Sequence, residues 1–175
     1  MATATAHSVG VNTRGVLYVH SSPRALCPHL EWAVGGVLGR AVNFDWTEQP
    51  VLRGAMRAEF YWEGRIGTGA ALASSLHGWD GLRYEITEDP TAVTDGVRYL
   101  HTPSLGIHVA QTDTAGNVVI GEDRMRYAME LAGSDALALQ RELHIALGQQ
   151  WDDELEAFRH ASEGSQVIWL HSYAG

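Results

Sequence analysis

Three segments of the chain repeat one short pattern that ends in a histidine. Residues 16–21, 97–102 and 167–172 each read valine, any residue, aromatic, aliphatic, histidine and a small hydroxyl residue. Valine and aromatic residues favour β-strands, in which alternate side chains share a face. Each copy therefore predicts a hydrophobic strand that ends in a histidine.

The three histidines would form a site if their strand ends meet. Imidazoles of His20, His101 and His171 would then suit a transition metal with an open coordination position. A polar cluster that binds an anion or exchanges protons is a second possibility. The third, which we favour, is that each histidine merely ends a core strand, so that no metal or cofactor is predicted.

The densest run of reactive side chains follows the first of these strands. It contains Ser21, Ser22, Arg24, Cys27 and His29, and it lies between a strand and a predicted helix. Backbone N–H groups and the helix dipole favour anions at such a point. The predicted ligand-binding residues are therefore Ser21, Ser22, Arg24, His20, His101 and His171.

This junction also offers a nucleophile. A cysteine at a helix N-terminus has a lowered pKa, and a neighbouring histidine can take its proton. Cys27, His29 and His20 are accordingly the catalytic candidates. A small buried thiol beside surface histidines is the simpler interpretation, and it leaves no catalytic residue assigned.

Charged side chains alternate with apolar ones along the predicted strands. Asp45, Arg57, Glu59, Arg83 and Glu85 would share polar strand faces. Such a face forms either a cross-strand ladder of ion pairs or the floor of a polar pocket. No phosphate-binding loop, dinucleotide fingerprint, zinc helix or nucleophile elbow is present in the sequence.

Composition excludes several classes of function. The formal net charge is −9, which disfavours nucleic acid and anionic membrane surfaces as partners. All basic residues are arginine, so Schiff-base chemistry on a lysine is excluded. A single cysteine excludes an intramolecular disulfide, and no apolar run approaches the ~18 residues of a membrane helix. These features predict an acidic, lysine-free cytoplasmic protein.

The first half of the chain predicts a ferredoxin-like unit of β-α-β-β-α-β order. Alternation and helical periodicity place strands at 15–20, 42–46, 56–62 and 82–87, and helices at 28–38 and 68–76. Cys27 would cap the first helix. This order is typical of an antiparallel sheet with its helices on one face.

The second half predicts the order β-β-β-α-α-β. Its strands fall at 97–101, 105–111, 118–120 and 166–172, and its helices at 122–133 and 134–158. Ser134 would cap the second helix and Gly148 would kink it. We expect a flexible tail at 1–13 and one α+β domain at 14–175, with packed subregions 14–88 and 96–175.

Several motifs resemble those of an uncharacterised actinobacterial family of unknown function. The resemblance rests on residues 14–21, 23–29, 31–33 and 42–46 and extends over about 13–175. It implies a small cytoplasmic protein whose genes often lie near those of type II fatty-acid synthesis, and hence an acyl-chain or acyl-carrier partner. No catalytic residue carries over from the family.

The favoured function is a non-catalytic ligand-binding, protein-binding or regulatory module. Its partner would be a small anionic ligand or a protein, and an acidic carrier protein would require Arg14, Arg24 and Arg98 to cluster. A homodimer is also possible, through an exposed C-terminal edge strand. The alternatives are a small acyl- or thioester-handling enzyme that uses Cys27 with a histidine, and a histidine-bound metal protein.

Overall fold

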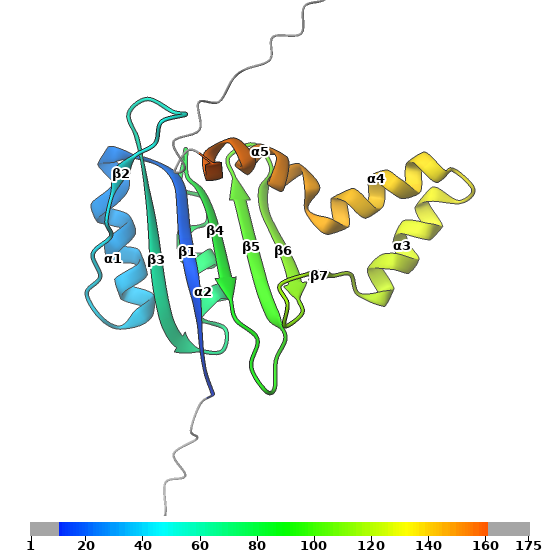
Figure 1. Ribbon diagram of the computed structural model, residues 1–175, viewed down its shortest axis with the longest axis horizontal. Helices are drawn as coiled ribbons and strands as arrows, with labels where there is room; N and C mark the ends of the chain where they lie inside the picture. Colours follow the sequence, from blue (N-terminus) through cyan, green and yellow to red (C-terminus); the bar gives the residue numbers. More distant parts are fainter. Residues whose placement is uncertain (1–10, 161–175) are drawn as a thin grey trace, which may run out of the picture.

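A computed structural model describes residues 11–160, which form one seven-stranded sheet and its helices (Figure 1). The strands are β1 (Asn12–Pro23), β2 (Thr47–Glu48), β3 (Ala55–Arg65), β4 (Arg83–Glu88), β5 (Gly96–Thr102), β6 (Gly106–Thr112) and β7 (Val118–Val119). The helices are α1 (Cys27–Leu38), α2 (Thr68–Leu76), α3 (Glu122–Ala132), α4 (Ala136–Leu147) and α5 (Gln149–Arg159), with a 3₁₀ turn η1 (Arg24–Leu26) before α1.

The strand order is β2-β3-β1-β4-β5-β6-β7, and every neighbouring pair is antiparallel. The first four strands follow the ferredoxin-like order, in which β1 and β3 occupy the centre. The predicted α+β class is therefore confirmed. Strands β5 to β7 extend the same sheet as a meander, so the two predicted subregions share one continuous sheet.

The main core lies between the sheet and helices α1 and α2. Leu17 of β1, Leu30 of α1 and Leu72 of α2 are fully buried there. We call this side of the sheet the core face. Tyr84 of β4 also points to it, because its hydroxyl donates to the Ala73 carbonyl of α2.

The opposite side of the sheet, here called the far face, is covered in part by α5. Leu155 of α5 is fully buried, and the helix crosses the upper ends of β4 and β5 (Figure 1). The prediction that all helices share one face holds for α1 and α2 but is wrong for α5. The reason is the amphipathic stripe of α5, which buries Leu155 and directs acidic groups toward arginines of the sheet.

Residues 42–46 alternate in burial as predicted but do not form a strand. The backbone N–H of Phe44 and the indole N–H of Trp46 both donate to one carboxylate oxygen of Glu31 in α1, at 2.8 and 3.0 Å. The main chain is thus held by a helix side chain instead of a strand ladder. Only Thr47 and Glu48 pair with β3.

The predicted long helix at 134–158 is interrupted, and Gly148 separates α4 from α5 with φ of +80°. A side chain at Gly148 would approach the His108 ring to 2.7 Å, so the break needs glycine for both conformation and space. Asp135, not Ser134, caps α4 by accepting from the N–H groups of Leu137 and Ala138.

The start of the sheet and the start of α1 differ from their predicted positions. Asn12 and Thr13 pair with β3, so the sheet begins inside the predicted tail. The N-cap of α1 is Leu26, and Cys27 is its first helical residue. The predicted strand at 166–172, with His171, lies outside the described residues. Within residues 11–160 no helix is long and apolar enough to cross a membrane.

Candidate functional site

The hydroxyl groups predicted at the junction after β1 point into the protein. The register of β1 shifts between Val19 and Ser22, and both Ser21 and Ser22 are fully buried. Ser21 Oγ accepts from Arg83 at 3.4 Å, and Ser22 Oγ donates to the carbonyl of Pro23. These buried serines therefore stabilise the end of the strand.

Cys27 is a buried thiol in this junction. Its Sγ lies 3.9 Å from the Pro23 carbonyl, and burial raises its pKa although Ser22 and Arg24 oppose the rise. The groups that influence this pKa include no histidine, and the side chain of His29 is exposed. A thiol with a raised pKa is a poor nucleophile at neutral pH, so the geometry gives the cysteine–histidine hypothesis no support.

The three arginines proposed for an acidic partner are each paired with an acid. Arg24 bonds Glu48 at 3.0 Å and Arg14 bonds Asp89 at 3.0 Å, whereas Arg98 bonds Glu85 at 2.7 Å. Arg24 belongs to the 3₁₀ turn that follows the C-terminal end of β1, whereas Arg14 is near the N-terminal end of the same strand. Arg24 is therefore separate from Arg14 and Arg98, which line one hollow together but are each bonded to an acid.

His20 and His101 lie near the C-terminal ends of β1 and β5, at the same end of the sheet, but on opposite faces. His20 Nε2 lies 3.4 Å from a Glu85 oxygen on the far face. His101 stacks on the Tyr84 ring on the core face, with centroids 4.9 Å apart, and its Nδ1 lies 3.0 Å from the Leu82 carbonyl. Burial, with a smaller effect of His77, lowers the pKa of His101.

The two histidines therefore cannot share a metal ion. Strand β4 separates β1 from β5, and the alternation of side chains sends the two rings apart. Among residues 11–160 no group of three or more histidine, cysteine, aspartate or glutamate side chains is placed to hold a metal. The third histidine of the pattern, His171, is beyond the described range.

A buried charge network lies on the far face where α5 meets the sheet; we call it the Glu85 cluster. Glu85 bonds Arg98 at 2.7 Å, Arg159 at 3.0 Å and His20 at 3.4 Å. Asp152 of α5 bonds the same two arginines at 2.8 and 2.7 Å. Burial alone would raise the pKa of Glu85, but the His20 hydrogen bond and the charges of Arg98 and Arg159 lower it to about 2.

A second set of contacts holds the remainder of α5. Arg83 bonds Glu154 at 3.3 Å and lies over the Phe158 ring at 4.7 Å. Ser104 donates to Glu154, and hydrogen bonds from Ser104 lower the pKa of Glu154 against the effect of burial. Asp152 and Glu154 of α5 are thus bonded to arginines of the sheet, whereas Asp153 and Glu156 are exposed.

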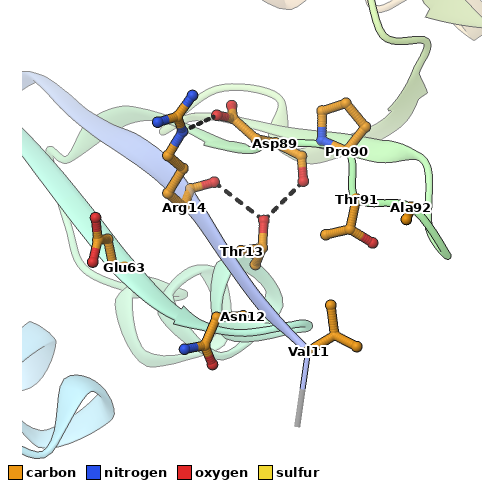
Figure 2. Close-up of a pocket in the computed structure, with 9 residues that line it drawn as sticks. All are labelled: Val11, Asn12, Thr13, Arg14, Glu63, Asp89, Pro90, Thr91 and Ala92. Carbon is orange, nitrogen blue, oxygen red and sulfur yellow. Dashed lines mark hydrogen bonds and ion pairs between the residues drawn. The ribbon is translucent and has the colours of Figure 1, made fainter.

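Two hollows beside β1 and β4 have their polar groups satisfied. Figure 2 shows one of about 520 Å³, where Thr13 donates to the Asp89 carbonyl at 2.8 Å and Arg14 pairs with the Asp89 carboxylate. The other, of about 620 Å³, lies on the far face and includes Glu85 and Arg98, which already bind each other. Neither leaves a buried polar atom without a partner.

A third hollow lies over β1 and β3 beside the end of β1, and we call it the β1–β3 groove. It has a volume of about 560 Å³ and is lined by Tyr18, Val19, His20, Asp45, Thr47, Glu48, Pro50, Arg57, Ala58 and Glu59. The Nη1 atom of Arg57 is buried and has no hydrogen-bond partner. A buried guanidinium nitrogen without an acceptor is costly, which makes this groove the best candidate for a binding site.

Three carboxylates and one guanidinium line the groove. Asp45 and Glu59 are exposed at its rim, and Glu48 is shared with Arg24. Burial first, and then the charges of Glu59 and Glu85, raise the pKa of Tyr18. The field of these carboxylates therefore reaches the aromatic wall of the groove.

Comparison with known proteins places the chain in a family. A family model described as a protein of unknown function, DUF3145, matches residues 16–172. The chain belongs to the DUF3145 family. No curated protein and no solved structure matches the chain. The family thus agrees with the expected uncharacterised family, and its match extends beyond the described residues to include the third histidine pattern.

The sequence indicates part of the groove, but it does not indicate which residues of α5 pair with Glu85. Arg57, Glu59 and Asp45 were expected on polar strand faces, as a ladder or a pocket floor, and they line the groove. Asp152 and Arg159 were not recognised as partners of Glu85. Their separation of seven residues, two helical turns on one face, is the signal that would have found them.

Proposed function

We propose that this DUF3145 protein is a non-catalytic binding module whose β1–β3 groove receives a positively charged segment of a partner protein. The observation that carries the proposal is the unpartnered Nη1 of Arg57 in a groove rimmed by carboxylates. A peptide supplies both missing groups at once. Its main-chain carbonyl would accept from Arg57, and its cationic side chain would meet Glu59 and Asp45.

The aromatic wall of the groove supports a cation as the recognised group. The Tyr18 ring stacks with His20 at 6.1 Å and lies beside Glu59. A cation over an aromatic face gains up to about 1–2 kcal/mol, and adjacent carboxylates add to the attraction. The net charge of −9 also draws basic partners toward the protein over longer distances.

The arrangement of the candidate catalytic groups supports a non-catalytic role. The Cys27 thiol is buried with a raised pKa, the His101 ring is packed on the core face, and His20 is bonded to Glu85. Cys27 and His20 are thus engaged in structural contacts, whereas His29 is exposed to solvent. The enzyme alternative would require Cys27 to leave its contact with Pro23.

If the protein acts in fatty-acid synthesis, as the family resemblance implies, this proposal favours a basic partner over an acidic acyl-carrier protein. An acidic acyl-carrier protein would need unpaired arginines, whereas Arg14, Arg24 and Arg98 each hold an acid. A small anionic ligand at Arg24 would likewise need an unpaired guanidinium, whereas Arg24 is bonded to Glu48. A partner in that metabolism would therefore dock through a basic surface segment of an enzyme.

Fluorescence polarisation with a labelled hexa-arginine peptide tests this function at 0.15 M salt. We expect binding by the wild-type protein, and a Kd raised about twofold to fivefold by Glu59→Gln, the range of one exposed ion pair. Asp95→Asn removes one exposed carboxylate before β5, away from the groove, and serves as the matched control. It should leave the Kd within a factor of about 1.5.

Two results would contradict the proposal. Equal weakening by Glu59→Gln and Asp95→Asn would show that the peptide responds only to net charge. Binding of a hexa-glutamate peptide as tight as that of hexa-arginine would reverse the predicted sign of the groove.

A further inference from the structure

His108 of β6 lies beneath the junction between α4 and α5, on the far face of the sheet. Its ring packs against the Trp151 ring of α5, with the two centroids 4.8 Å apart. The Trp151 indole N–H donates to the Gly106 carbonyl at the start of β6, at 3.0 Å. The first turn of α5 is therefore attached to β6 by a ring contact and a hydrogen bond.

One nitrogen of the His108 ring is buried without a partner. Among residues 11–160, its Nε2 atom has no hydrogen-bond partner. This edge of the ring faces Gly148, where an added Cβ would lie 2.7 Å from Nε2. The Gly148 carbonyl already accepts from the backbone N–H groups of Trp151 and Asp152. The junction thus offers Nε2 no free acceptor at its nearest glycine.

The neutral imidazole fits this environment, whereas the imidazolium does not. A neutral ring can carry its hydrogen on Nδ1 and leave Nε2 as a lone pair, but a protonated ring carries a hydrogen on both nitrogens. Protonation of His108 would therefore bury a charged N–H donor without an acceptor, which is costly. The packed junction favours the neutral form.

The charged groups around His108 come from α3, α5 and β5. Burial is the main cause that lowers the pKa of His108; Asp152 opposes it, and the charges of Arg98 and Arg124 add to it. The Asp152 carboxylate is already bonded to Arg98 at 2.8 Å. From α4, Glu142 bonds Arg124 at 3.3 Å. The surroundings thus resist a positive charge on the ring.

We propose that His108, Trp151 and Gly148 form an acid-sensitive joint, in which protonation of the imidazole detaches the first turn of α5 from β6. Water then reaches the imidazolium and accepts from its N–H groups. Gly148 suits the hinge of this movement, because glycine tolerates wide changes in φ and ψ. The chain enters α5 from α4 at this glycine (Figure 1), so the opening also loosens the attachment of α4.

The remainder of α5 should stay in place at the pH that opens the joint. Asp152 and Arg159 belong to the Glu85 cluster, and Glu85, with a pKa of about 2, is still ionised at pH 5. Leu155 is fully buried on the same helix. The change is therefore confined to the first turn of α5. It involves no residue that lines the β1–β3 groove, so it is independent of the proposed function.

The joint should open as the pH falls below about 6.5, the usual pKa of a histidine. Because the closed joint lowers the pKa of His108, the closed state loses stability as the pH falls from the open-state pKa toward the closed-state pKa. Between pH 7.5 and pH 5, an open-state pKa of about 6.5 limits the change in the opening equilibrium to about thirtyfold.

Solvent exchange of the Trp151 indole N–H, measured by NMR on the full chain, tests the joint. Its resonance is assigned by comparison with Trp151→Phe. The protection factor, relative to free tryptophan at the same pH, should fall by about threefold to thirtyfold from pH 7.5 to pH 5. In His108→Phe, which keeps a ring but does not titrate, it should change by less than about twofold. His29→Phe, at an exposed histidine, is the matched control and should behave as wild type.

A second probe separates local opening from global unfolding. The backbone N–H of Leu17, in the middle of the sheet, exchanges when the whole fold opens. The Trp151 indole should be less protected than this amide at every pH, because it needs only the joint to open.

Three results would overturn the inference. A Trp151 protection factor that is constant with pH in the wild type shows that the joint does not respond to acid. An equal fall in wild type and His108→Phe assigns the response to another group. Equal protection of Trp151 and Leu17 shows that only global unfolding exposes the indole. Circular dichroism verifies that His108→Phe is folded, and His108→Gln, which also does not titrate, replaces it otherwise.

Discussion

Replacing Glu85 by glutamine should remove a large part of the stability of the fold. The carboxylate is 11% exposed and bonds Arg98 and Arg159, both of which also bond Asp152. Glutamine has nearly the same volume but no charge. It would leave Arg98 and Arg159 partly uncompensated in a poorly hydrated site.

The magnitude follows from the pKa of Glu85. The folded protein lowers this pKa from 4.5 to about 2, and each pKa unit corresponds to about 1.4 kcal/mol. Glu85→Gln should therefore destabilise the protein by about 3 kcal/mol at pH 7. With a urea dependence of about 2 kcal/mol per molar, the unfolding midpoint falls by about 1.5 M.

The pH dependence gives the sharper test. A carboxyl whose pKa is lowered on folding stabilises the protein above its unfolded pKa, and this contribution is lost as the pH falls from about 4.5 toward 2. Glutamine does not titrate. The difference in unfolding free energy between wild type and Glu85→Gln should thus shrink by more than half between pH 7 and pH 3.

Urea unfolding followed by tryptophan fluorescence at pH 7, 5 and 3 provides the measurement. Glu59→Gln changes an exposed acid on the same sheet face and should alter stability by less than about 0.5 kcal/mol. The reasoning is refuted if Glu85→Gln is as stable as Glu59→Gln at pH 7. It is refuted equally if the difference from wild type does not change with pH.

Three further predictions concern other parts of the fold. Cys27→Ala should leave hexa-arginine binding unchanged, and the native thiol should react with Ellman's reagent far more slowly than the denatured one, because it is buried. His101→Phe should flatten the loss of stability as the pH falls below about 6.5 in urea titrations, because the lowered pKa of His101 favours its neutral form in the folded state. Gly148→Ala should lower stability by about 2–3 kcal/mol in thermal or urea melts, since φ is +80° and the new Cβ meets the His108 ring. Gly78→Ala, with the same φ and open space around it, should lower stability by only about 1 kcal/mol.

Local patterns were sufficient for most helices and strands. The helix Thr68–Leu76 is found at its predicted residues, because its apolar spacing and flanking glycine are local signals. The order β-α-β-β-α-β led directly to the arrangement of β2, β3, β1 and β4, since few topologies accommodate it. The predicted strand at 42–46 fails for the opposite reason, because the Glu31 carboxylate of α1, outside this segment, accepts from the Phe44 backbone N–H.

The candidate site was harder to predict than the fold. The histidine pattern correctly indicated two strands, but whether His20 and His101 meet depends on strand order and face. The groove around Arg57 brings residues of β1 together with residues 45–59, which include β2 and part of β3 and lie about 25 residues or more further along the chain. No local pattern indicates which arginine nitrogen remains without a partner after folding.

The sequence by itself determined the α+β class, the ferredoxin-like first half, the polar and apolar faces of the strands and the acidic, lysine-free character of the chain. Periodicity and composition are local or summed properties, so they can be read without coordinates. Tertiary structure alone decided that Cys27 is buried, that His20 and His101 lie on opposite faces, and that Asp152 and Arg159 complete the Glu85 cluster. These outcomes depend on long-range packing and desolvation, which set the pKa values and partners of side chains that no short segment brings together.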